Sequence, residues 1–327
     1  CPEEVVKYLV GLFPDALGVP WPSRGLPLHC LLSRRTTEEE EMDGTTKKKE
    51  EVRRRLNLDL VRMLVEAYPD ALTNQDSQSR KTPLLCACER DDVSMDMVQL
   101  LVDSDLSVLG IGGGYGDAIP LEVLMKQYSS AEAWHPPFDV VRFFVESAPE
   151  TITPSILNKI CGSRNITLEI VQLVIENRPD VSFLDQVDGN RMLPLHSLCL
   201  NDNKKDQDSW LLPIIQYVVN LYPRAVREVN NYGMLPVSYA VRTTLEITKF
   251  LVEEYPESVS VSLVRGSIFH DACRSGGIET VKYLYEKNPL AIKSVNYPAL
   301  HLPFESGRDV DAKLDFLLEE HPQSIRA

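Results

Sequence analysis

Four histidines share one position in a pattern that recurs along the chain, and they are the residues most suggestive of metal chemistry. They are His29, His196, His270 and His301. Imidazole is a common zinc ligand, but a zinc–nitrogen bond is only about 2 Å long. Equivalent positions in stacked helical units lie roughly 10 Å apart, which is the separation of packed helices. We therefore predict a structural hydrogen bond near a helix start for each histidine, and no metal site.

A glycine-rich stretch at residues 110–116, Gly-Ile-Gly-Gly-Gly-Tyr-Gly, suggests a loop that cradles phosphate. Such a loop needs a Lys-Ser/Thr pair that reaches phosphate and Mg²⁺, and this stretch lacks it. The glycine spacing also does not fit a dinucleotide fingerprint. Because glycine tolerates positive φ, we predict a flexible hairpin tip and no cofactor.

The seven cysteines are an odd number, and four of them occupy one equivalent place in the recurring pattern. These four are Cys88, Cys161, Cys199 and Cys273. We predict that they are buried as small apolar residues, which suits a reducing compartment better than a disulfide framework does. Cys86 and Cys88 lack zinc-site spacing and a second ligand pair. No Ser/His/Asp or Cys/His constellation stands apart from the pattern, so we predict no enzyme activity.

Composition bounds the remaining function classes. The apolar content of 43% is enough for a core, and the net charge of −14, with a pI near 5.0, disfavours general binding to nucleic acid or an anionic membrane. No apolar run approaches the roughly 18 to 20 residues that cross a bilayer. We also expect no cleavable signal at the start. We expect an intracellular protein, in the cytoplasm or the nucleus, without membrane insertion.

The element that must position these residues is a repeated helix followed by proline. The clearest copy spans residues 249–259, Lys-Phe-Leu-Val-Glu-Glu-Tyr-Pro-Glu-Ser-Val. Nine copies occur; eight end at Pro14, Pro69, Pro149, Pro179, Pro223, Pro256, Pro289 and Pro322, and a weaker one runs from Met97 to Leu106. The last four prolines are 33 residues apart each time, which is typical of a stacked repeat array.

Each copy predicts an amphipathic helix, called here the second helix of its unit. One column of positions is apolar or aromatic in every copy: Val10, Val65, Val102, Val145, Ile175, Val219, Val252, Tyr285 and Leu318. The position after it is acidic in seven of nine copies, as in Glu66 and Glu253. We expect the first column to face the core and the next to face water. The acidic column fits a solvated stripe, with a basic partner or calcium as the alternative.

Basic and acidic residues four apart on these helices also predict ion pairs of a few tenths of a kcal/mol each. The pairs are Arg62 with Glu66, Arg142 with Glu146, Lys249 with Glu253, and Lys282 with Glu286.

A shorter first helix precedes most second helices, and proline stands at its start, where a missing N–H costs little. The segments 26–29 (Leu-Pro-Leu-His), 193–196 (Leu-Pro-Leu-His), 235–238 (Leu-Pro-Val-Ser) and 82–85 (Thr-Pro-Leu-Leu) carry this signature. They resemble the Thr-Pro-Leu-His-x-Ala motif of the ankyrin repeat, and the likeness covers essentially the whole chain. The departures are leucine in place of the threonine, and Pro-x-Ala after the second helix in place of Gly-Ala-Asp. A HEAT-like array is the alternative, but its units are longer, roughly 40 residues or more.

The resemblance implies an all-α helical-hairpin solenoid over residues 1–327, as a single domain with one outer helix and about eight repeats. Residues 1–17 form a partial repeat, and we expect the natural protein to extend past one or both ends. First helices are expected to start near residues 26, 82, 119, 155, 193, 235, 267 and 298. Insertions at 33–58, which is charged, 127–138 and 201–210 are expected to project from one edge. Trp21, Trp134 and Trp210 lie outside the repeated helices, where they either fold loops back onto the stack or act as recognition anchors.

The resemblance also implies a function, because the concave surface of similar proteins receives a protein partner. We expect a non-catalytic scaffold for protein–protein interaction. The alternatives are a targeting or regulatory arm of a larger enzyme or assembly and, less favoured, an enzyme with a ligand site at residues 110–118. The residues predicted to face the partner are Glu89, Lys126, Arg242 and Arg274 on the first helices, and Tyr115, Arg191, Tyr232, Arg265 and Tyr297 on the hairpin tips.

Overall fold

The computed structural model describes residues 3–21, 25–33, 57–90, 92–103, 105–114, 116–125, 136–163, 166–178, 187–201, 207–263, 266–293 and 309–322. Within these ranges the regular secondary structure consists of α-helices and short 3₁₀ helices, and strand-like pairing is limited to three isolated bridges. The expectation of an all-α fold is therefore confirmed. Contacts divide the chain into two compact units, residues 1–151 and residues 152–327.

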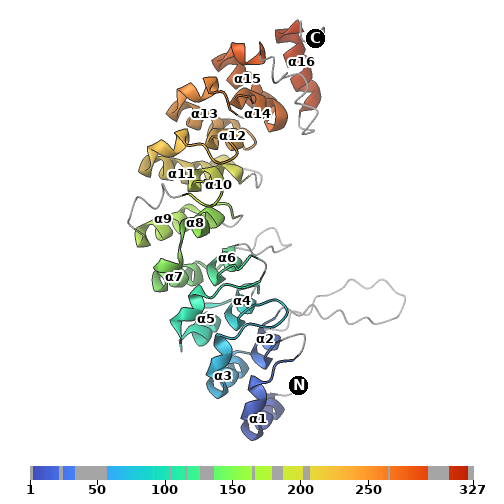
Figure 1. Cartoon of the computed structure of the whole chain (residues 1–327), viewed down its shortest axis with the longest axis vertical. Coiled ribbons are helices and arrows are strands. Elements are labelled where there is room, and N and C mark those ends of the chain that lie inside the picture. The colour runs from blue at the N-terminus through green and yellow to red at the C-terminus, as the bar shows by residue number, and fades with distance from the viewer. Residues whose placement is uncertain are drawn as a thin grey trace, which may run out of the picture. The chain divides into compact units, whose positions relative to one another are not determined.

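Unit 1 holds two layers of helices (Figure 1). The first helices are α2 (Pro27–Leu32), α4 (Pro83–Cys88) and α6 (Pro120–Met125), and each packs against the next. The second helices are α1 (Glu3–Leu12), α3 (Leu58–Ala67), α5 (Met95–Val102) and α7 (Phe138–Ser147), which also pack in order.

Unit 2 has the same two kinds of helix (Figure 1). Its first helices are α8 (Pro154–Cys161), α10 (Pro194–Leu200), α12 (Pro236–Ala240) and α14 (Ile268–Ser275). Its second helices are α9 (Leu168–Asn177), α11 (Gln207–Leu221), α13 (Leu245–Glu254), α15 (Ile278–Lys287) and α16 (Val310–Glu320). Successive members of each layer contact one another, and seven of the eight expected first helices are present at the predicted places. The eighth, expected near residue 298, lies outside the described residues.

Helix starts follow directly from side-chain chemistry. Six of the first helices begin with proline, whose absent N–H would have no partner inside the helix. Thr82 and Thr153 precede two of them and accept hydrogen bonds from the N–H groups of Leu85 and Ile156, both at 3.3 Å. Among the second helices, Ser94, Thr167 and Thr244 cap the starts of α5, α9 and α13 in the same way. Each such cap contributes about 1 kcal/mol.

Helix ends show an element that the sequence pattern did not predict. The prolines after the second helices start 3₁₀ helices. These are η1 (Pro14–Gly18), η2 (Pro69–Leu72), η4 (Pro149–Thr151), η6 (Pro223–Arg227), η7 (Pro256–Ser260) and η8 (Pro289–Lys293). Several of their apolar residues, such as Leu72 and Val226, are buried. Proline both stops the preceding helix and presets φ for the short helix after it.

The expected insertion at residues 201–210 is in part wrong, because α11 already begins at Gln207 and contains Trp210. The helix also accommodates Pro213 in its interior, at a typical cost of about 3 kcal/mol. Leu211 is fully buried, and burial of a leucine contributes roughly 1.5 to 3 kcal/mol. The apolar run therefore offsets the proline and lengthens the helix.

The side-chain columns of the second helices are confirmed. The apolar column is buried at Val65, Val102, Val145, Val219 and Val252, and half-buried in the four other copies. The nine residues of the following column are all exposed, Glu66 and Glu253 among them. One column thus faces the core and its neighbour faces water, as expected from an amphipathic helix.

In three of the four predicted ion pairs, the basic residue makes another contact. Lys249 pairs with Glu246 at 2.8 Å, and Lys282 pairs with Glu279 at 3.6 Å. The Arg142 guanidinium lies over the ring of Phe138, 4.9 Å from its centroid. An acidic residue on the N-terminal side of a basic one agrees with the helix dipole, whereas the predicted order opposes it.

Trp21 also departs from expectation. Its backbone pairs with Gly25 through two hydrogen bonds of 2.8 and 3.2 Å, but its side chain is exposed. The interpretation that this ring folds its loop back onto the stack is therefore wrong, and Trp134 lies outside the described residues. The charged segment within 33–58 is also outside them, at residues 34–56.

Candidate interaction surface

Three of the hairpin tips, which are the loops that lead into the first helices, are closed by the side chain of an aspartate or an asparagine. Asp188 Oδ1 accepts from the N–H groups of Asn190 and Met192, both at 2.8 Å. Asn230 Oδ1 accepts from those of Tyr232 at 3.0 Å and Met234 at 3.1 Å. In both tips the backbone N–H of the closing residue donates to the carbonyl four residues on, at 3.1 Å. These side chains replace backbone partners that a short loop cannot supply.

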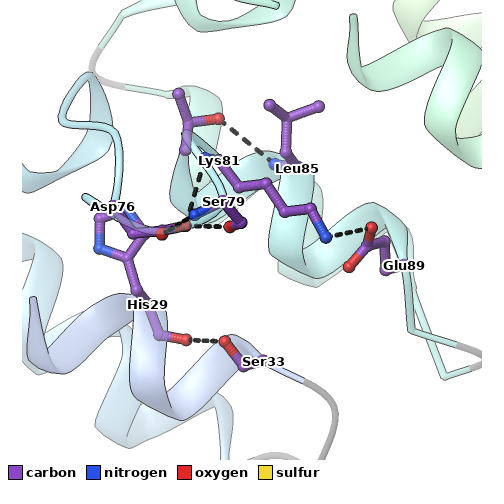
Figure 2. A network of polar contacts seen from close by, with 8 residues as sticks. His29, Ser33, Asp76, Ser79, Lys81, Leu85 and Glu89 are labelled. Carbon is purple, nitrogen blue, oxygen red and sulfur yellow. Dashed lines mark hydrogen bonds and ion pairs between the residues drawn. The ribbon is translucent and has the colours of Figure 1, made fainter. Parts of the chain in front are cut away.

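Asp76 closes the tip before α4 in the same manner. Figure 2 shows its carboxylate directed at Ser79 and Lys81, and its Oδ1 accepts from the N–H groups of Gln78 at 2.9 Å and Ser79 at 2.6 Å. Burial alone would raise the pKa of Asp76, but the hydroxyl and N–H of Ser79 and the N–H groups of Lys81 and Gln78 lower it below its ordinary value. The tip therefore holds an ionised carboxylate at neutral pH.

The tips also place at least one residue each in the left-handed backbone region, from the tip before α2 to the tip before α14, except at the short connection before α8. Glycine does this at Gly25, Gly233 and Gly266, but Arg80, Asp117 and Arg191 do it with φ between 54° and 56°. The left-handed region costs a residue with a Cβ roughly 1 kcal/mol or more. The recurring hydrogen bonds of the tip compensate for that strain.

Neighbouring tips are tied to each other within each unit. In unit 2 the Asn231 N–H donates to the Asn190 carbonyl at 2.9 Å, and its side-chain amide donates to the Gly189 carbonyl at 3.2 Å. In unit 1 the Gln75 side chain donates to the Gly112 carbonyl at 2.7 Å. These hydrogen bonds fix the position of each tip relative to its neighbour.

The glycine-rich stretch contributes to one of these connected tips, the one that precedes α6. Gly113 and Ala118 exchange hydrogen bonds of 3.1 and 3.0 Å, so the predicted hairpin tip is confirmed. A Cβ on Gly113 would lie 2.1 Å from the Arg80 carbonyl oxygen. Glycine is therefore required by the close approach of two backbones, and no phosphate chemistry is needed to explain it.

The histidines bind backbone groups. His196 accepts at Nδ1 from the N–H of Leu193 at 3.1 Å, and its Nε2 lies 3.2 Å from the Met234 carbonyl in the next tip. His29 Nε2 lies 2.9 Å from the Asn74 carbonyl in the tip before α4. His270 Nδ1 accepts from the N–H of Ser267 at 3.1 Å. The structural role is confirmed for these three, and His301 lies outside the described residues.

Burial fixes the protonation state of two of these rings. Desolvation lowers the pKa of His196 to about 4 and lowers the pKa of His29 below its ordinary value. A neutral ring with its proton on Nε2 can donate to a carbonyl while Nδ1 accepts from an N–H. In α8 an amide does the same work, because Asn158 Nδ2 donates to the Met192 carbonyl at 2.6 Å.

The four cysteines of the repeat are buried, as predicted. Desolvation raises the pKa of Cys161 and Cys273 to about 12 and raises that of Cys88 and Cys199 still further above the ordinary value. Each thiol is thus a neutral packing group.

The residues predicted to face a partner fall into two groups. Lys126, Tyr115, Arg265 and Tyr297 lie outside the described residues. Arg191 and Tyr232 are exposed on tied tips, and Arg242 is exposed directly after α12. Glu89 follows α4 and pairs with Lys81 at 2.6 Å (Figure 2), and Arg274 in α14 pairs with Asp271 at 3.3 Å. Since α12 and α14 contact each other, Arg242 and Arg274 come from adjacent elements.

Charge divides between the two kinds of helix. In unit 2 the second helices carry twelve acidic and four basic residues, whereas the first helices carry one acidic and two basic residues. In unit 1 the second helices carry seven acidic and three basic residues, and the first helices carry only Glu122, which is buried. Among the helices that the structure describes, acidic side chains are therefore concentrated on the second helices.

The structure also bears on enzymatic, metal and membrane hypotheses. A shallow depression of about 290 Å³ lies over α5 and α7, lined by Met95, Phe138, Asp139, Arg142, Phe143 and Glu146. Among the described residues, no three His, Cys, Asp or Glu side chains gather as a metal site would require. None of the helices in the same ranges has the length and apolarity to cross a membrane.

No protein-family model and no curated protein matches the chain.

Proposed function

We propose that the chain is an ankyrin-like helical-hairpin solenoid that acts as a non-catalytic scaffold for a protein partner. The partner-binding face comprises the first helices and the tips that precede them. The order of first helix, second helix and tip, repeated in both units, supports this architecture. So does the regular burial of equivalent histidines, cysteines and apolar columns.

The observation that carries the functional proposal is the tied pair of tips in unit 2. Arg191 and Tyr232 are exposed, Tyr232 to 55%, on backbones fixed by Asp188, Asn230 and the Asn231 contacts. Tyrosine and arginine are enriched among residues that dominate interface energies. A fixed backbone lowers the entropy cost of association, so such a surface is prepared for binding.

The test is capture of binding partners from the native source by the immobilised chain. The double variant Arg191→Gly with Tyr232→Ala removes both exposed side chains, and glycine is compatible with the left-handed φ at position 191. We expect captured protein to fall by about tenfold or more, a typical loss when an interface anchor is removed, with an unchanged thermal midpoint. Undiminished capture by this variant would exclude the tips from the binding face.

A matched control removes the same two residue types elsewhere. Tyr8→Ala with Arg224→Ala deletes an exposed tyrosine on α1 and an exposed arginine on η6. This control should capture as much protein as the unmodified chain.

A further inference from the structure

We propose that the first-helix face of unit 2 selects an acidic peptide segment, with Arg242 and Arg274 as its carboxylate contacts. This inference rests on the proposed function, because it names the chemistry of the partner for the same face.

Charge complementarity favours an acidic occupant on this face. The twelve acidic residues of unit 2's helices other than Asp271 all lie on the second helices, which therefore repel an acidic segment. The first helices carry two basic residues and Asp271, whose side chain is buried against Arg274. Exposed charges act over about 8 Å at physiological ionic strength, so an acidic segment on the first helices is largely screened from the acidic residues of the second helices.

Arg274 is positioned by the fold. Its Nη1 donates to Asp271 Oδ1 at 3.3 Å, and Asp271 is only 4% exposed, so it is a fixed anchor. A guanidinium presents five N–H donors in a planar fork, which allows it to bridge an internal carboxylate and that of a ligand. The pairing thus orients Arg274 on the first-helix face.

The spacing of the two arginines defines a peptide pattern. Arg242 and Arg274 occupy the same register in adjacent repeats, and α12 packs on α14. Packed helices lie about 8 to 10 Å apart, while a peptide in the polyproline II conformation has three residues per turn and advances about 3.1 Å per residue. Acidic side chains three residues apart therefore lie on one face of such a peptide, about 9 Å apart, and match the two guanidinium groups.

The experiment measures binding of fluorescent twelve-residue peptides to the full chain by anisotropy in 150 mM NaCl. One peptide carries glutamate at every third position, and a second has the same composition with its glutamates clustered at one end. We expect the spaced peptide to bind about fivefold more tightly, since two forked ion pairs contribute more than unmatched charge. Equal binding of the two peptides would overturn the proposal and leave only unspecific attraction.

Variants locate the site. Arg242→Glu with Arg274→Glu should weaken the spaced peptide by at least about tenfold, because attraction becomes repulsion. Arg224→Glu with Lys293→Glu makes the same charge change on η6 and η8, where both side chains are exposed, and should leave binding within about twofold. Unchanged binding by the first variant, or an equal loss with the second, would contradict the assignment.

Two more readouts separate the alternatives. Arg242→Lys with Arg274→Lys keeps the charge but loses the fork, so the preference for the spaced peptide should disappear. A lysine-rich peptide of the same length serves as the probe for the acidic second helices. If it binds more tightly than the spaced acidic peptide does, the proposal is overturned. If neither acidic peptide binds while tip-dependent capture persists, this inference fails and the scaffold function stands.

Discussion

At the residue scale, the tips depend on a few side chains that replace backbone partners. Asp76, Asp188 and Asn230 accept N–H groups of their own loops, and His196 bridges Leu193 and the next tip. Each of these side chains is held in one orientation by its hydrogen bonds. Their energetic roles can be tested one at a time.

The buried ring of His196 makes stability dependent on pH. Its pKa is about 4 in the folded chain against an ordinary value of 6.5, so the unfolded chain binds the proton more readily. Stability from this group is fully present above pH 6.5 and is lost as pH falls from 6.5 to about 4. The total is on the order of 3 kcal/mol. His29 acts in the same direction.

Urea unfolding followed by circular dichroism between about pH 7.5 and 4.5 would check this pH dependence. At the upper end of that range, His196→Gln should be less stable than the unmodified chain, but its stability should vary less with pH. Parallel curves for the two proteins would contradict the assignment of the pH dependence to His196.

Gly113 is expected to tolerate no Cβ. Gly113→Ala would place that atom 2.1 Å from the Arg80 oxygen and 2.8 Å from Leu85 Cδ1. Shifting packed groups to make room costs about 1 to 3 kcal/mol, which should appear as a lower urea midpoint and faster hydrogen exchange at Ala118. Gly189→Ala is the control, because nothing lies within 4 Å of its added Cβ. An equal effect of both variants would contradict a close backbone approach at Gly113.

At the element scale, the helices are set by their ends as much as by their faces. Proline or a hydroxyl cap starts most helices, and proline ends most second helices and opens a 3₁₀ helix. These local rules can be read from the sequence, which is why the starts of the first helices were predicted within a few residues. The 3₁₀ helices were missed because a proline after a helix indicates a stop but does not specify the conformation of the residues beyond it.

The cap of α13 allows a direct test of this local control. Thr244 Oγ1 accepts from the Ile247 N–H at 3.3 Å. Thr244→Ala should lower the free energy of unfolding by about 1 kcal/mol, while Thr244→Ser keeps the acceptor and should lose only a small part of that. Denaturant melts of the three proteins provide the measurement, and equal losses for alanine and serine would show that the hydroxyl does not cap the helix.

At the scale of the whole molecule, the repeated pattern predicted the all-α class, the helix order and the core column. The candidate surface was predicted only in part. Arg191, Arg242 and Tyr232 are exposed as expected, but the pairing of Glu89 with Lys81 and of Arg274 with Asp271 was not foreseen. Side-chain partners across a turn depend on rotamers and loop geometry, which a repeat period does not encode. The closing Asp and Asn residues, which stand six or seven positions before the first residues of α4, α10 and α12, were the available signal for the tips.

The buried thiols of Cys88, Cys161, Cys199 and Cys273 can report on local opening of the folded chain. These four cysteines are buried, so a thiol reagent reaches each sulfur only when the structure around it opens locally. Cys88 lies in unit 1, and Cys161, Cys199 and Cys273 lie in unit 2. Alkylation rates, read out cysteine by cysteine by mass spectrometry, would rank the local opening equilibria along the chain without any engineered label. Reagent-resistant sulfurs in one half and reactive ones in the other would reveal that the two halves yield independently.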